Sequence, residues 1–254
     1  MSNVVAIIQA RLNSSRFPAK TLEVLYDKPL LEHIIERVQA SRLLKRIVVA
    51  TTTQPADDAI VTLAKRLNVD VCRGSEANVL SRFHEAAVQS RAEVIVRITA
   101  DDPFKDPEVI DRAIDLLLTQ GYDYCSNTLT PSFPEGLDVE AFSFAALQTA
   151  FFQAKLDSEK EHVTPYIWKR PEKFSLHNFT HQPNLSQLRW TIDYEKDILF
   201  AREIYRRLYP RKRIFLMRDI LDLLESEPGL SDLNSGVIRN EGYYLSVEQE
   251  SNHE

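Results

Sequence analysis

The feature that most constrains the fold is a regular alternation of strand and helix patterns in the first half of the chain. Apolar runs rich in β-branched residues predict strands, which lie at 4–9, 46–52, 69–74 and 93–100. Amphipathic patterns predict a helix after each of them, at 30–41, 57–68, 78–90 and 106–121. This order predicts an α/β fold: a Rossmann-like, mostly parallel sheet with helices on both faces.

The rhythm changes after Gly121, where a turn-rich segment containing Pro131 and Pro134 begins. Further helices are predicted at 143–155, 158–170, 194–210 and 218–228, and strands at 173–180 and 186–193. No internal repeat or low-complexity linker divides the chain. We therefore expect one domain over residues 1–254, with an inserted lobe at about 125–185, and a frayed polar tail over the last residues.

Charge and composition exclude several classes of protein. A formal net charge of −6 disfavours general nucleic-acid binding, although a local basic pocket for phosphates is compatible with it. No apolar run approaches the ~20 residues that span a bilayer, and the N-terminus lacks the pattern of a signal peptide. Cys72 and Cys125 fit no metal-ligand spacing and are expected to be free thiols. The expected location is the cytoplasm, without membrane attachment.

In parallel α/β sheets, ligands bind beyond the carboxyl ends of the strands. Those ends predict four candidate loops, at 9–16, 51–58, 73–78 and 99–104.

The first loop carries the chemistry of a phosphate site. Arg11, Arg16 and Lys20 flank a strand end, and Ser14 and Ser15 add hydroxyl donors. The loop matches neither G-x-x-x-x-G-K-[ST] nor G-x-G-x-x-G, so a P-loop NTPase and a dinucleotide fold are not indicated. The alternative is that its three cations are solvated surface charges.

Acidic residues follow two of the predicted strands. Asp101 and Asp102 follow the strand at 93–100, where a carboxylate facing a basic loop would let Mg²⁺ bridge protein and phosphates. Adjacent strand residues point to opposite sides, so one of the two is expected as ligand. Asp193 ends another predicted strand and would complete the metal site. The alternatives are a turn for Asp101 and Asp102, and a helix N-cap for Asp193.

Two other groups give weaker signals. Glu135, Asp138 and Glu140 surround Gly136, a pattern that surface hairpins also show. His162 forms no zinc-type pair with another histidine, and the chain has no G-x-S-x-G elbow for serine hydrolysis.

Nine segments of the sequence together resemble one family. In chain order they are IIQARLNSSRFPAKTL, LEHIIERV, IVVATTTQPADDAI, RGSEANVLSRF, VRITADDP, YDYCSNTL, PEGLDVEAFSFAAL, SEKEHVTPYI and LRWTIDYEKD. They resemble the spore-coat-polysaccharide cytidylyltransferases, a branch of the acylneuraminate and Kdo cytidylyltransferases within the nucleotide-diphospho-sugar transferase fold. The resemblance runs from about residue 4 to about residue 205.

The resemblance implies specific roles. Ala10, Arg11, Ser14, Arg16 and Lys20 would hold CTP, with Arg11, Lys20 and Asp101 as catalytic groups. Arg73, Gly74 and Ser75 would lie near the base, and Asp101 and Asp193 would bind Mg²⁺. Glu135, Asp138, Glu140 and His162 would face the acceptor. The inserted lobe would form a homodimer.

The sequence departs from the family pattern at three positions. Asn13, Ala19 and Ala100 stand where the family usually has glycine. Loss of these glycines is expected to narrow the available backbone conformations and crowd the phosphates, with an altered donor or lower activity as the alternative outcome. Asn tolerates a left-handed backbone better than Ala does, so this expectation applies to Ala19 and Ala100.

The resulting interpretation is a CTP-dependent nucleotidyltransferase that transfers CMP to a sugar acid and releases pyrophosphate. The same fold could act on a sugar phosphate, a phosphonate or a polyol phosphate, or serve a glycosyltransferase that uses a nucleotide sugar. A catalytically silent nucleotide-binding partner is the third alternative.

Overall fold

The computed structural model describes residues 2–14 and 16–251, so the expected contribution of Ser15 lies outside the described residues. Within them, the central sheet has the strand order β5-β4-β1-β6-β8-β7-β9. Strands β1 (Val4–Gln9), β4 (Arg46–Thr52), β5 (Asp70–Gly74) and β6 (Val94–Thr99) are parallel neighbours. The predicted mostly parallel α/β sheet is confirmed.

The second half of the chain extends the same sheet. Strand β8 (Glu140–Ser143) runs antiparallel to β6 and to β7 (Tyr124–Ser126), and β9 (Leu176–Asn178) runs parallel to β7. These three strands fall within or at the edge of the segment predicted as an inserted lobe. A separate hairpin joins β2 (Val24–Leu25) to β3 (Lys28–Pro29).

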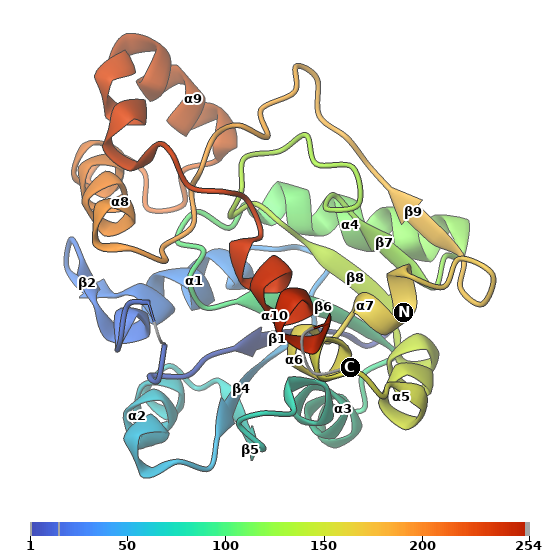
Figure 1. Cartoon of the computed structure of the whole chain (residues 1–254). Helices are drawn as coiled ribbons and strands as arrows, with labels where there is room; N and C mark the ends of the chain where they lie inside the picture. Colours follow the sequence, from blue (N-terminus) through green and yellow to red (C-terminus); the bar gives the residue numbers. More distant parts are fainter. Residues whose placement is uncertain (1, 15, 252–254) are drawn as a thin grey trace.

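Helices cover both faces of the sheet (Figure 1). One face packs on α1 (Leu30–Gln39), α2 (Asp58–Arg66), α4 (Pro107–Gln120), α8 (Glu195–Leu208) and α9 (Met217–Ser226). The other packs on α3 (Val79–Ser90), α5 (Phe144–Gln153) and α7 (Pro165–Trp168). The remaining helical elements are η1 (Lys20–Leu22), η2 (Pro55–Asp57), α6 (Asp157–His162), η3 (Pro228–Asn234) and α10 (Glu241–Ser251).

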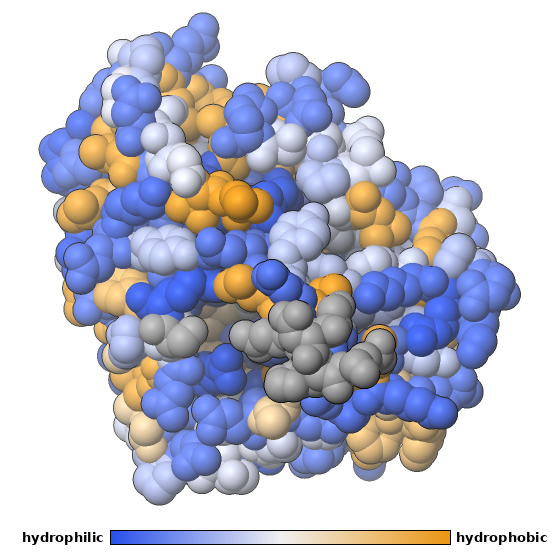
Figure 2. Space-filling view, in the orientation of Figure 1, coloured by the Kyte–Doolittle hydropathy of each residue, from blue (hydrophilic) through white to orange (hydrophobic). Residues whose placement is uncertain are grey.

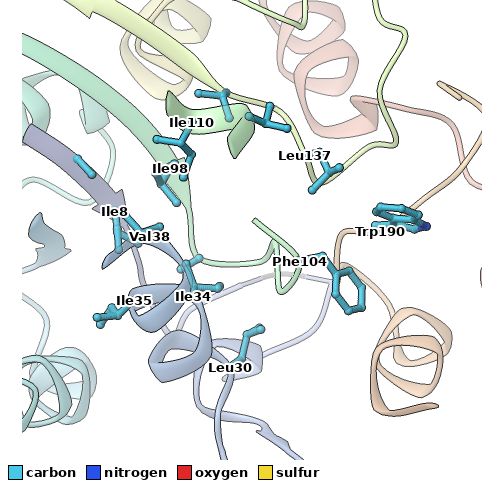
Figure 3. Packing of buried hydrophobic residues seen from close by; sticks show 14 of the residues in the cluster. Ile8, Leu30, Ile34, Ile35, Val38, Ile98, Phe104, Ile110, Leu137 and Trp190 are labelled. Atoms are coloured by element: carbon cyan, nitrogen blue, oxygen red, sulfur yellow. The ribbon is translucent and has the colours of Figure 1, made fainter. Parts of the chain in front are cut away.

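Alternation along the strands creates two apolar cores, one on each face. In β1, Ala6 and Ile8 face the first core, whereas Val5 and Ile7 face the second. Figure 3 shows the first core, where Ile8 and Ile98 of the sheet meet Ile34 of α1. In the same core Phe104 makes an edge-to-face contact with Trp190, with ring centroids 6.1 Å apart.

The predicted strand at 186–193 is wrong. Within residues 2–14 and 16–251 this segment makes only an isolated bridge, Glu135 to Arg189, and its neighbouring backbone bonds go to the 135 loop and to Asp101. Gly136 allows this close approach: its φ is +100°, and a Cβ there would lie 2.7 Å from the carbonyl carbon of Trp190. The segment therefore packs against a loop, with no regular strand beside it.

The frayed tail predicted at the C-terminus is also wrong for its described part, because residues 241–251 form helix α10. This helix lies in front of the sheet in Figure 1. It is held by tertiary contacts: Glu250 accepts from the backbone and the hydroxyl of Ser158, at 2.5 and 2.8 Å. Since α10 has no apolar stripe, no periodicity in the sequence revealed it.

Among the described residues, no helix combines the length and apolar character that crossing a bilayer requires. The face of the molecule in Figure 2 is largely hydrophilic, with scattered apolar patches.

Candidate active site

A cavity of about 760 Å³ lies beyond the carboxyl ends of β1 and β6. Its walls come from the loops after these strands, from the 128–140 segment, from α6 and from α10. The residues predicted from sequence that line it are Ala10, Arg11, Ser14, Arg16, Lys20, Asp101, Glu135, Asp138, Glu140, His162 and Asp193. Residues distant in the chain are thus brought to one place.

Three residues expected near the base are not on this cavity. Arg73 donates to the carbonyl of Thr52 (2.8 Å), to the carbonyl of Gln54 (2.9 Å) and to Asp58 Oδ1 (2.6 Å). Ser75 Oγ accepts from the backbone N–H of Asn78, and Gly74 packs against an arginine of α3. In this structure the 73–75 segment therefore supports the loop before α3, and its expected place near the base of the nucleotide stays a prediction.

The centre of the site is a cation held between two carboxylates. Lys20 Nζ donates to Asp101 Oδ2 and Asp193 Oδ1, both at 2.9 Å, and to the carbonyl of Ile192 at 2.6 Å. Arg16 donates to the same Asp193 oxygen at 2.7 Å. Burial alone would raise the pKa of Asp193, but the charges and hydrogen bonds of Lys20 and Arg16 hold that pKa well below its usual range.

Asp101 and Asp193 form a donor set that suits a divalent metal ion. The Lys20 ammonium between them shows that their oxygens converge on one cation. Carboxylate oxygens suit Mg²⁺, which takes one or two carboxylates and completes its shell with water and substrate phosphates. Among the described residues no group of three or more His, Cys, Asp or Glu could hold a metal, so a nucleotide would have to supply the other oxygens.

The neighbouring Asp102 has a different environment. It accepts from Thr99 Oγ1 at 2.6 Å and pairs with Lys105 Nζ at 2.8 Å. Burial raises its pKa to about 6. Asp101 thus lies beside Lys20 and Asp102 beside Lys105. Both follow the end of β6 at Thr99 and both line the cavity, so the alternation expected of strand residues does not separate them. Asp193 is not an N-cap, since α8 is capped at Tyr194.

The loop before Lys20 is strained at Ala19. Ala19 has φ +59°, in the left-handed region where the family usually has glycine. Asn13 and Ala100 are not among the described residues with positive φ. The left-handed backbone is therefore found at Ala19 and is absent at Ala100.

Replacing Ala19 by glycine is expected to raise the free energy of unfolding by about 0.5–1 kcal/mol. Relief of the ~1–2 kcal/mol cost of a left-handed Ala exceeds the ~0.5–1 kcal/mol that glycine adds in unfolded-chain entropy. Urea unfolding followed by circular dichroism measures the change. Asn13→Gly and Ala100→Gly are matched controls and are expected to destabilise, and a loss of stability in Ala19→Gly would contradict the argument.

Each of the three acids of the 135–140 segment is paired with an internal cation. Glu135 Oε2 accepts from Arg189 at 2.8 Å, and Glu140 Oε2 accepts from Arg97 at 2.5 Å. Asp138 accepts from Arg239, the residue two before α10. These acids line the cavity, but their side chains are engaged with cations, so they position those cations and are not free to act as general bases.

His162 joins α6 to the C-terminal helix. Its Nε2 lies 3.0 Å from Ser246 Oγ, and its ring makes an edge-to-face contact with Tyr243, with centroids 5.2 Å apart. Burial, and then the charge of Arg97, lower the pKa of His162 to about 4. The imidazole is therefore neutral at pH 7.

This pKa predicts an acid-sensitive contribution to stability. The folded-state pKa of His162, about 4, lies below the unfolded value of about 6.5, so the unfolded chain binds more protons between these values. His162→Gln is therefore expected to lose less stability than wild type as pH falls from 6.5 to 4, by at most about 1.4 kcal/mol per pH unit. Urea titrations of both proteins across this range measure the difference, and parallel pH profiles would refute it.

Several functional residues were not found from sequence. Arg97, Arg189 and Arg239 pair with the cavity acids, and Arg82 and the α10 residues from 241 to 246 form part of its wall. One signal was available: Arg82 falls on the apolar stripe of a predicted helix, between Val79 and Ala86, where an arginine needs a partner or a function. The contribution of α10 had no such signal.

Comparison with known proteins identifies the class of enzyme. The mostly parallel sheet is shared with a solved cytidylyltransferase, so the fold is that of a nucleotidyltransferase. A family model described as cytidylyltransferase matches residues 5–225, and the chain belongs to this family of enzymes. The family that the sequence motifs resembled is thereby confirmed.

Individual relatives cover nearly the whole chain. An uncharacterized protein of Methanocaldococcus jannaschii is 38% identical over 97% of this chain and 99% of its own length. The spore coat polysaccharide biosynthesis protein SpsF of Bacillus subtilis is 32% identical over 90% and 96%. A solved cytidylyltransferase of Leptospira borgpetersenii superimposes with a TM-score of 0.88 at 29% identity, covering 94% of this chain and all of that one.

Proposed function

We propose that the enzyme transfers CMP from CTP to a sugar acid of the nonulosonate or Kdo type, releasing pyrophosphate, in the synthesis of a surface polysaccharide or glycoconjugate. The observation that carries this proposal is the convergence of Asp101, in the loop after β6, and Asp193, just before α8, on the Lys20 ammonium. They meet inside a cavity large enough for a nucleotide and a sugar. The sugar acid is supported by motif resemblance, and the polysaccharide context by the name of the Bacillus relative.

In the proposed reaction an acceptor oxygen attacks the α-phosphorus of CTP, and the bond to the bridging oxygen of pyrophosphate breaks. This chemistry needs positioning and charge stabilisation more than a covalent residue. Mg²⁺ bound to Asp101 and Asp193 would neutralise charge on the reacting phosphates. Lys20 keeps the two carboxylates together, and Arg11 and Ser14 offer donors to phosphate oxygens from the loop after β1.

The acceptor end of the cavity lies between the 128–140 segment and α10. Arg97 donates to Gln9 and Glu140 through Nε and Nη1, and within residues 2–14 and 16–251 no hydrogen bond uses its Nη2. This guanidinium corner is a donor available to the carboxylate of a sugar acid. Tyr243, His162 and Trp168 form a ring cluster beside it, where the face of a sugar can pack.

The experiment combines the protein with each NTP, Mg²⁺ and a panel of acceptors, and follows pyrophosphate. Release with CTP and a sugar acid supports the proposal. Release with a sugar phosphate, a phosphonate or a polyol phosphate assigns a different acceptor class. Use of a nucleotide sugar without pyrophosphate indicates a glycosyltransferase, and no turnover with any pair indicates a silent nucleotide-binding partner.

A homodimer is part of the same proposal. Phe152 of α5, within the segment predicted as a lobe, is 72% exposed, and Val88 of α3 is 51% exposed. The two helices contact each other, so these side chains mark the surface that a second copy would cover in this proposal. Light scattering after size exclusion measures the mass, and Phe152→Glu should yield the monomer if this surface forms the dimer.

A further inference from the structure

Arg82 of α3 is a buried cation that forms no ion pair with a described carboxylate. The residue is 2% exposed and lies on the wall of the cavity. Its Nη1 donates to the carbonyls of Ser75 (2.6 Å) and Glu76 (3.3 Å). Its Nε is buried and has no partner in the described chain, and none of the described carboxylates forms an ion pair with it.

Arg11, after β1, is a second unpaired cation beside it. Within the described ranges its side chain makes no hydrogen bond or ion pair, and it lies on the same cavity. After burial, the charge of Arg11 is the largest influence that lowers the pKa of Arg82, so the two guanidinium groups are near each other. By contrast, Lys20 and Arg16, which the sequence suggested for phosphates, are engaged with Asp101 and Asp193.

Two like charges that share a low-dielectric site repel each other. The charges of Asp57 and Glu76 act on Arg82 in the opposite direction, but neither carboxylate forms an ion pair with it. Guanidinium groups recognise phosphate through paired N–H donors, and the start of α3, whose Val79 also lines the cavity, adds the positive end of a helix dipole. A neutral base would offset none of this charge, whereas a polyphosphate would offset both cations.

We propose that Arg82, together with Arg11, binds the polyphosphate chain of the nucleotide, an inference that rests on the proposed function. Gly74 serves this arrangement, because a Cβ there would lie 2.9 Å from Cγ of Arg82. In the 73–75 segment the glycine therefore makes room for the arginine that reaches the phosphates.

Calorimetry with inorganic tripolyphosphate, CTP and CMP tests the inference without an acceptor. Arg82→Met is expected to weaken the binding of tripolyphosphate and of CTP at least about 10-fold, the effect of losing a hydrogen bond to a charged group. The affinity for CMP should fall less than about 2-fold. Arg211→Met is the matched control, since this exposed arginine lies outside the cavity and its removal changes net charge equally. It should bind all three ligands as wild type does.

A second variant separates binding from folding. Arg82→Met loses two bonds to backbone carbonyls, whereas Arg11→Met loses no internal side-chain bond and should fold normally while showing the same selective loss. In the double variant the losses should be less than additive, because one anion is shared. If CMP and CTP binding were weakened equally, Arg82 would contact the base or only support the loop, and the inference would be overturned.

The two proposals can fail separately. If the wild-type enzyme releases pyrophosphate from CTP but both arginine variants bind tripolyphosphate normally, the inference fails and the proposed function stands. If tripolyphosphate binding depends on both arginines but no acceptor supports pyrophosphate release, the polyanion site stands and the proposed function fails.

Discussion

Replacing Asp101 by asparagine is expected to lower CTP-dependent pyrophosphate release about 100- to 1,000-fold, the range found when one preorganised electrostatic group is removed from an active site. The amide preserves the shape of the side chain and can still accept from Lys20, but it removes one of the two negative charges that converge on the cation site. A continuous pyrophosphate assay with CTP and whichever acceptor of the panel supports turnover gives kcat and KM. The loss should appear in kcat, because the charge acts on the reacting phosphates.

The control for this experiment is Asp115→Asn, an exposed carboxylate on α4 that lies outside the cavity. It removes the same charge from the protein and should leave the rate unchanged. Asp193→Asn should resemble Asp101→Asn if both carboxylates hold one metal ion. Turnover by Asp101→Asn at the wild-type rate would show that the metal is bound elsewhere.

Much of the fold could be predicted from the sequence, because the patterns that indicate its strands and helices lie within short stretches of the chain. Uninterrupted β-branched runs are typical of strands buried on both faces, and they identified β1, β4 and β6. The loops that follow those strands contained Arg11 and Asp101, so the position of the site followed from topology. The segment at 186–193 shows the limit: Trp190 and Ile192 are apolar in alternation, as in a strand, but Arg189 and Thr191 are buried as well, and no neighbouring strand within the described residues pairs with them.

The contacts of the site were less predictable because they join residues far apart in the chain. Lys20 and Asp193 are 173 positions apart, and Asp138 and Arg239 are 101 apart. The family resemblance assigned Glu135 to the acceptor, and the resemblance together with the place of Lys20 after the first strand assigned Lys20 to the phosphates. The structure shows that each is paired with another charged side chain, which depends on packing that a single sequence does not reveal.

Arg189→Met is expected to cost about 3–5 kcal/mol in the free energy of unfolding, the typical effect of removing one partner from a buried ion pair. Arg189 donates to Glu135 (2.8 Å), Asp193 (2.9 Å) and Asp197 (3.0 Å), and the Asp197 side chain is fully buried. Methionine fills much of the volume but leaves the buried carboxylates without a cation. Urea unfolding followed by circular dichroism measures the loss.

Arg207→Met provides the comparison, because Arg207 pairs with the more exposed Glu203 and Glu227. This substitution should lower the free energy of unfolding by at most about 1 kcal/mol. The loss in free energy of unfolding for Arg189→Lys should lie between those of the two methionine variants. Lysine keeps the positive charge, but it lacks the planar guanidinium whose several donors bind three carboxylates at once. Equal losses for the methionine variants would mean that the buried network is no more stabilising than a surface pair. A large loss for Arg189→Met would instead show that the network holding Asp193 in the active site also stabilises the fold, because Asp197 accepts from the backbone N–H of Asp193 at 2.9 Å.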